Sequence, residues 1–136
     1  MTNRKPKTKM AGYMPRFHKL SLEMQRWALM LTEELEQWPG VSKKPMFGFT
    51  SFYRGKTIFA AVPKTKALGS PNSVIFKLPK ESKWRDEAAK DARIQSESME
   101  THKWLQFEIG KESDLRDALV WFERAFQSVK TTPQMR

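Results

Sequence analysis

The chain has 136 residues, of which 39% are hydrophobic and 12% aromatic, and this composition suits one domain with its own hydrophobic core. It contains no cysteine, which excludes disulfides, thiolate metal sites and cysteine nucleophiles. The formal net charge is +10, and residues 37–80 contain eight Lys or Arg residues and no Asp or Glu. Such a basic region is typical of proteins that bind polyanions such as nucleic acid, although surplus lysine also serves solubility alone.

The N-terminal part combines a basic segment with an amphipathic helix. Residues 1–14 are polar and basic without hydrophobic periodicity, which predicts a disordered basic arm followed by a single domain over residues 15–136. Apolar residues then recur at spacings of three and four, which predicts a helix over roughly residues 22–37. Ser21 is suited to be its N-cap, and the following proline and glycine end it.

The middle of the chain has the features of a β-hairpin and a third strand. Residues 45–53 are rich in aromatics and predict one strand, and an Arg-Gly pair separates it from a second strand over about residues 56–62. Residues 63–72 carry prolines and a glycine, so we expect a loop there. Apolar and other residues alternate over residues 74–78, which predicts the third strand.

The C-terminal part predicts a helix, a strand and a final helix. Residues 81–94 are rich in alanine and charge and predict a helix, while residues 103–109 alternate as a fourth strand. A strong apolar stripe over roughly residues 112–130 predicts the last helix. The expected fold is therefore α+β, with an antiparallel four-stranded sheet, helices packed on one face, and the order α-β-β-β-α-β-α.

Four short motifs in the predicted strands resemble a known family. They are Met-Phe-Gly at residues 46–48, Phe-Tyr-Arg-Gly-Lys at 52–56, Phe-Ala at 59–60 and Val-Ile-Phe-Lys-Leu at 74–78. Together they resemble the hairpin core of the TfoX N-terminal domain, and the order of elements is similar to that of the related YjbR (MmcQ)-like proteins. The similarity covers about residues 22–129, but Phe49 stands where the family has the second glycine of a Gly-Gly pair. The resemblance implies an α+β fold and a regulatory or unassigned binding role, associated in TfoX with bacterial competence, and it brings no catalytic residues.

The residues themselves offer no recognisable catalytic or metal site. The two histidines, His18 and His102, lack the spacing of metal ligands, and no serine lies in a nucleophile-elbow pattern. We therefore expect a protein without enzymatic activity, metal or cofactor. Because the chain has no cysteine and no long apolar stretch, we expect it in the cytoplasm and not in a membrane. Its partner is then another protein or nucleic acid, and whether it is a monomer or a dimer stays open.

Basic residues interleaved with aromatics are the most suggestive pattern for binding. The candidate nucleic-acid or anion-binding residues are Lys43, Lys44, Arg54, Lys56, Lys64 and Lys66. Sheets that bind single-stranded nucleic acid combine such cations with aromatic rings for stacking, although helices must cover one sheet face. Trp104 and Phe52 are candidates for a partner interface, because Trp104 points away from the apolar side of its strand. The leading interpretation is a regulatory or binding domain with a macromolecular partner, and the alternative is sequence-nonspecific nucleic-acid binding. A third hypothesis is an enzyme or small-ligand protein with a pocket between the sheet and residues 81–100.

Overall fold

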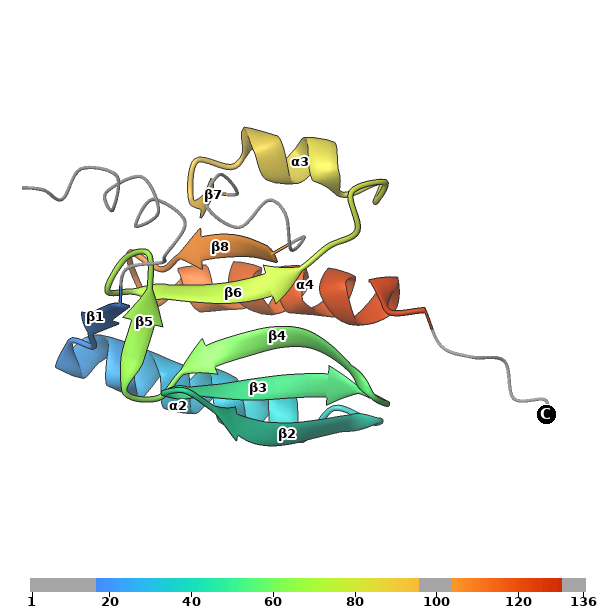
Figure 1. Ribbon diagram of the computed structural model, residues 1–136. Helices are drawn as coiled ribbons and strands as arrows, with labels where there is room; N and C mark the ends of the chain where they lie inside the picture. Colours follow the sequence, from blue (N-terminus) through green and yellow to red (C-terminus); the bar gives the residue numbers. More distant parts are fainter. Residues whose placement is uncertain (1–16, 96–103, 131–136) are drawn as a thin grey trace, which may run out of the picture.

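The computed structural model describes residues 17–95 and 104–130, and the predicted arm over residues 1–14 lies outside them (Figure 1). Most of the described strands form one antiparallel sheet. In spatial order its strands are β2 (Val41–Met46), β3 (Phe49–Arg54), β4 (Thr57–Pro63), β6 (Ser73–Lys77), β8 (Trp104–Glu108) and β7 (Ile94–Gln95). A second, two-stranded sheet pairs β1 (Phe17–Lys19) with β5 (Lys66–Leu68). The fold is α+β, but the expectation of a four-stranded sheet is wrong, because the large sheet has six strands and a small sheet accompanies it.

The described helices are α2 (Leu22–Glu36), α3 (Arg85–Lys90) and α4 (Asp114–Ser128). Helix α2 begins as predicted at Ser21, whose hydroxyl accepts a hydrogen bond from the backbone N–H of Met24 at 3.0 Å. Helices α2 and α4 lie side by side on one face of the large sheet and run in the same direction (Figure 1). An ion pair between Arg26 and Glu112 connects the beginnings of the two helices.

The core lies between these two helices and the sheet. Side chains alternate along the strands except at the irregularity in β4, where Phe59 and Ala60 both join the core. Phe52, Phe76 and Phe107 on the helix side are fully buried. Phe122 of α4 is also fully buried among them, as its place on the apolar stripe predicts. Each buried aromatic removes a large apolar area from water, so this layer holds much of the folding free energy.

The predicted hairpin is present, but it begins later than expected. Strands β3 and β4 pair antiparallel, with an irregularity of the register between Phe52 and Tyr53. The interpretation of residues 45–53 as one strand is wrong, because Phe47 and Gly48 turn the chain between β2 and β3. Both have a positive φ, 44° and 86°, and the ring of Phe47 is 91% exposed. Phenylalanine rarely adopts a positive φ, and aromatic residues are common in strands. The sequence pattern therefore predicts a strand at Phe47, where the chain in fact turns.

Strands β4 and β6 meet at a narrow seam in the middle of the sheet. Their pairing consists of Ala60 opposite Phe76 and Ala61 opposite Ile75. The sheet is therefore made of two halves, β2–β3–β4 and β6–β8–β7, and both contact helix α4 through β4 and β6.

Two further expectations need correction. The predicted loop over residues 63–72 contains β5, which pairs with β1 from the other end of the chain. The helix predicted over residues 81–94 is only α3, and the chain after it turns at Asp91 into β7. Arg124 of α4 bonds Glu87 of α3 at 2.9 Å and so joins this short helix to the main helix layer.

Candidate nucleic-acid interface on the open sheet face

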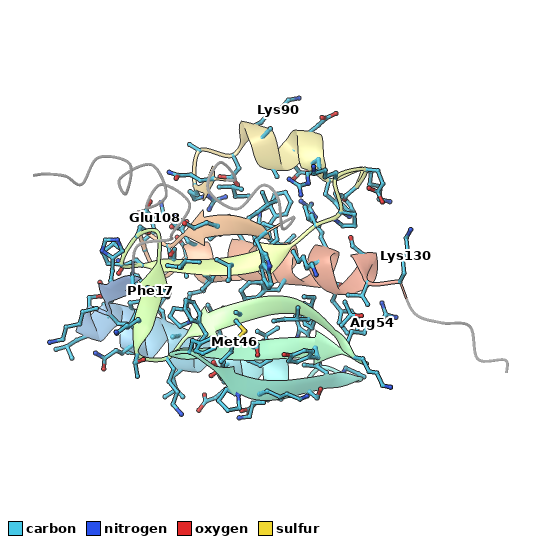
Figure 2. The ribbon with its side chains drawn as sticks, viewed as in Figure 1. Phe17, Met46, Arg54, Lys90, Glu108 and Lys130 are labelled. Carbon is cyan, nitrogen blue, oxygen red and sulfur yellow. The ribbon has the colours of Figure 1, made fainter. Side chains whose placement is uncertain are left out.

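The second face of the large sheet, which we call the open face, has no helix on it in the part of the chain that the structure describes. The strand registers and the alternation of side chains place these residues on it: Lys44, Met46, Phe49, Ser51, Tyr53, Ile58, Ala61, Ser73, Ile75, Lys77, Trp104, Gln106 and Glu108. Figure 2 shows this side of the sheet toward the viewer, with Met46 near its centre.

Strand β5 and the turn after it cover one end of the open face. Leu68 packs on Phe49 and Ile75, and all three are at most 6% exposed. The hydroxyl of Ser73 donates a hydrogen bond to the carbonyl oxygen of Leu68 at 2.6 Å. This end is therefore a small second core and not a binding surface.

The other end of the open face displays two aromatic rings, each beside a lysine. Tyr53 on β3 and Trp104 on β8 are both half-buried, and Trp104 also packs against the small second core. The ammonium nitrogen of Lys44 lies 5.2 Å from the centre of the Tyr53 ring, and that of Lys77 lies 5.9 Å from the centre of the Trp104 ring. Lys77 stands directly opposite Trp104 in the register of β6 and β8. Both distances are those of cation–π contacts, so the lysine charges lie at the ring faces.

The charge distribution keeps this end positive. Strands β2 to β6 contain no Asp or Glu, because they lie within the acid-free residues 37–80. Glu108 also faces this side, but it pairs with Ser73 at the end that β5 covers. The rings of Tyr53 and Trp104 therefore lie in a locally cationic environment, which favours an anionic ligand.

The structure does not gather the six predicted cations into one patch. Lys44 lies on the open face, and Lys56, Lys64 and Lys66 are exposed at turns and on β5. Lys43 points to the other side of β2 and forms an ion pair with Glu36 of α2.

Arg54 also faces the helix layer. It donates a hydrogen bond to the carbonyl oxygen of Phe126 at 3.0 Å, and its guanidinium lies 4.3 Å from the centre of that ring. This side chain is therefore engaged in packing α4 on the hairpin.

The two predicted interface residues have different positions. Trp104 is on the open face as its alternation predicts, whereas Phe52 is fully buried in the core and presents no surface to a partner. Lys77 was not among the predicted site residues. Its alternation with the buried Phe76 is the signal that could have identified it.

A second polar cluster joins the segment before β7 to helix α4. Arg93 donates hydrogen bonds to Asp91 at 2.8 and 3.0 Å, to Asp114 at 2.9 Å and to Asp117 at 3.0 Å. The hydrogen bond from Arg93 holds the pKa of Asp91 below its ordinary value. Burial acts to raise the pKa of Asp114, but hydrogen bonds from the Gly110 backbone and from Arg93 outweigh it, so this pKa is also lowered. The cluster is a structural ion network, since its charges are already satisfied by one another.

No arrangement of three or more His, Asp or Glu side chains that could hold a metal ion occurs within residues 17–95 and 104–130. His18 lies on β1, and His102 is outside the described residues. Of the helices described, none is long and apolar enough to cross a bilayer. Comparison with protein-family models, with curated proteins and with solved structures found no significant match.

Proposed function

We propose that this protein is a non-enzymatic binding domain that binds single-stranded nucleic acid on the exposed end of its open face, without sequence specificity. The observation that supports this is the pairing of each half-exposed ring with a lysine, Lys44 with Tyr53 and Lys77 with Trp104. A base that stacks on either ring takes the place of the lysine ammonium at the ring face, and the displaced lysine neutralises a neighbouring phosphate. Binding of a macromolecule without catalysis also agrees with the role that the resemblance to the TfoX N-terminal domain implies. The cysteine-free sequence suits a cytoplasmic location.

The spacing of the rings favours an oligonucleotide over a mononucleotide. Tyr53 and Trp104 lie on strands β3 and β8, which are three strand intervals apart in the sheet order. At the usual interval between neighbouring strands this is about 14 Å, which is too far for one base to contact both rings. Single strands are favoured over duplexes because the faces of paired bases are already stacked on one another.

The test is a titration of a fluorescein-labelled oligothymidine of about twelve nucleotides, followed by anisotropy at several salt concentrations. We expect binding that is stronger than to a duplex of the same length and that weakens linearly in log affinity against log salt. The double variant K44A/K77A removes two phosphate contacts, so it lowers both the affinity and the salt slope, the latter by about 1.4. The variant K80A/K90A loses the same charge at two exposed lysines outside the strands of the large sheet and serves as the matched control.

Two results would contradict the proposal. The first is no binding of the oligonucleotide at tens of micromolar protein and 50 mM salt. The second is an equal loss of affinity in K44A/K77A and K80A/K90A, which would show that net charge matters and the open face does not. If the Trp104 ring instead anchors a protein, its substitution lowers partner binding with little salt dependence.

A further inference from the structure

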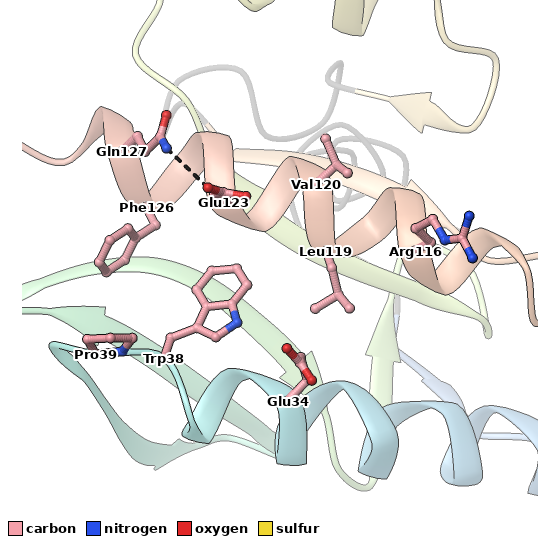
Figure 3. A pocket seen from close by; sticks show the side chains of 9 residues that line it. All are labelled: Glu34, Trp38, Pro39, Arg116, Leu119, Val120, Glu123, Phe126 and Gln127. Atoms are coloured by element: carbon pink, nitrogen blue, oxygen red, sulfur yellow. Dashed lines mark hydrogen bonds between the residues drawn. The ribbon is translucent and has the colours of Figure 1, made fainter.

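A groove runs between helices α2 and α4, in the helix layer and so on the opposite side of the molecule from the open face (Figure 3). It encloses about 540 Å³. Its lining residues are Glu34, Trp38, Pro39, Arg116, Leu119, Val120, Glu123, Phe126 and Gln127. No local pattern indicates this groove, because it depends on how two helices that are distant in sequence pack on the sheet.

The floor of the groove is apolar and already formed. Trp38 stacks parallel to Phe59 with ring centres 6.5 Å apart and meets the edge of Phe126 at 6.0 Å. Leu119 is half-buried beside them, and Val120 remains 40% exposed. A ligand that covers these side chains removes apolar surface from water without first having to order the rings.

The rim of the groove is acidic. Glu34 on α2 and Glu123 on α4 lie on opposite sides of it, while Arg116 lies at its far end (Figure 3). Seven residues of helix separate Arg116 from Glu123, which is about 10 Å along the axis. Helices α2 and α4 together carry seven acids and three arginines, a net charge of −4 within a chain of +10. The helix layer therefore favours a cationic ligand, although the whole protein repels one.

We propose that this groove binds a basic amphipathic helix of a partner protein. The groove extends along α4 from Arg116 to Gln127, about 16 Å, which accommodates three turns of a bound helix. Apolar residues at positions i, i+4 and i+7 of such a helix cover Leu119, Val120 and Phe126. Lysine or arginine residues that flank this apolar stripe face Glu34 and Glu123.

The shape and charge of the groove favour this occupant over two others. The groove is open along its length (Figure 3), whereas a small-molecule site buries most of its ligand. A second copy of this chain that docks through the same surface brings another helix layer of net charge −4 against the first, and like charges across an interface oppose association.

The test uses two synthetic helical peptides of about fourteen residues, one built from Leu and Lys and the other with Glu in place of every Lys. Each is labelled and titrated with the whole protein at physiological salt. We expect the Leu-Lys peptide to bind with a micromolar Kd. The Leu-Glu peptide should bind at least about tenfold more weakly. This order is opposite to the one that the net charge of +10 predicts, so it reports on the local acids.

Variants then locate the binding site. E34K/E123K should weaken the Leu-Lys peptide about tenfold or more, and V120E should do so by placing a charge in the apolar contact. The control E23K/E81K makes the same change of charge at two exposed acids outside the groove and should keep most of the affinity. Circular dichroism melting checks that each variant is folded.

Three outcomes would overturn the proposal: a preference for the Leu-Glu peptide, an equal loss in the groove and control variants, or a dimer in light scattering that E34K/E123K dissociates. The last would identify a second copy as the occupant. The groove variant E34K/E123K should not weaken oligothymidine binding, and K44A/K77A should not weaken peptide binding, because each change of charge favours the other ligand. Failure of one proposal is therefore distinguishable from failure of the other.

Discussion

Gly69 lies directly on the side-chain amide of Gln106: a Cβ atom at position 69 would stand 1.8 Å from Gln106 Oε1. Gln106 is only 6% exposed, so it has little room to move, and Gly69 also has a φ of +85°. We expect G69A to lower the free energy of unfolding by about 2–4 kcal/mol, from the left-handed conformation and the collision together. Urea denaturation measures this.

Gly55 is the matched control for this substitution. Its φ is +63°, but a Cβ atom there would have no neighbour within 4 Å. G55A should therefore cost only the conformational strain, about 1–2 kcal/mol. Equal losses in the two variants would show that β5 and its turn do not close tightly over the sheet.

The buried face of α4 is tested by Phe122. Its side chain is fully buried between the helix and the sheet, so F122A should destabilise the protein by about 3–5 kcal/mol. V120A, two residues away and exposed, should change stability by less than about 0.5 kcal/mol. A loss below about 1 kcal/mol for F122A in the same denaturation experiment would mean that this face is not the core.

The Arg93 network predicts a dependence of stability on pH. The folded state lowers the pKa values of Asp91 and Asp114, so both carboxylates contribute stability above their ordinary pKa, near 3.9. This contribution is lost as the pH falls below that value and through the lowered pKa values. R93M should cost about 2 kcal/mol at pH 7. The difference from the unchanged protein should shrink below pH 4, because the aspartates of the unfolded chain are protonated first and those of the folded protein at lower pH.

The measurement is the free energy of unfolding of both proteins from pH 7 to pH 3. The side chain of Arg93 is 33% exposed and that of Asp114 is 9% exposed, so solvent screens the network in part, and the cost stays below that of breaking a fully buried ion pair. A difference that is constant over this pH range would show that Arg93 contributes by packing on the Phe107 ring, 4.7 Å away, and not by its charge.

Stacking and charge on the open face should separate in titrations with oligothymidine. W104A should weaken binding by about 1–3 kcal/mol without changing the salt slope, since a ring releases no counterions. Y53A should behave similarly, while Y53F keeps the ring and the affinity. A reduced slope in W104A would instead mean that the ring only positions Lys77.

The parts of the fold that local patterns encode were predictable. The apolar stripes identified α2 and α4, alternation identified β6 and β8, and the Arg-Gly turn of a hairpin identified β4. Strand β5 was missed because its pairing partner β1 is about fifty residues away in sequence, and three residues between prolines and glycines carry little pattern of their own. Strand β2 was missed because it is an edge strand with four consecutive exposed residues, and a proline among them.

The candidate site was predictable only in part, for a similar reason. Trp104 follows from alternation along its strand, and Lys44 was predicted from the basic residues that are interleaved with aromatics. Whether a cation is available depends on what packs against it, and Arg54 finds its acceptor, the Phe126 carbonyl, 72 positions further along the chain. Composition therefore indicates a basic region, while tertiary contacts decide which of its charges face a ligand.

The narrow seam between β4 and β6 has a consequence for the open face. Tyr53 belongs to one half of the sheet and Trp104 to the other. The register joins the two halves through Ala60 opposite Phe76 and Ala61 opposite Ile75. The span between the two rings that we propose for stacking therefore depends on these two residue pairs.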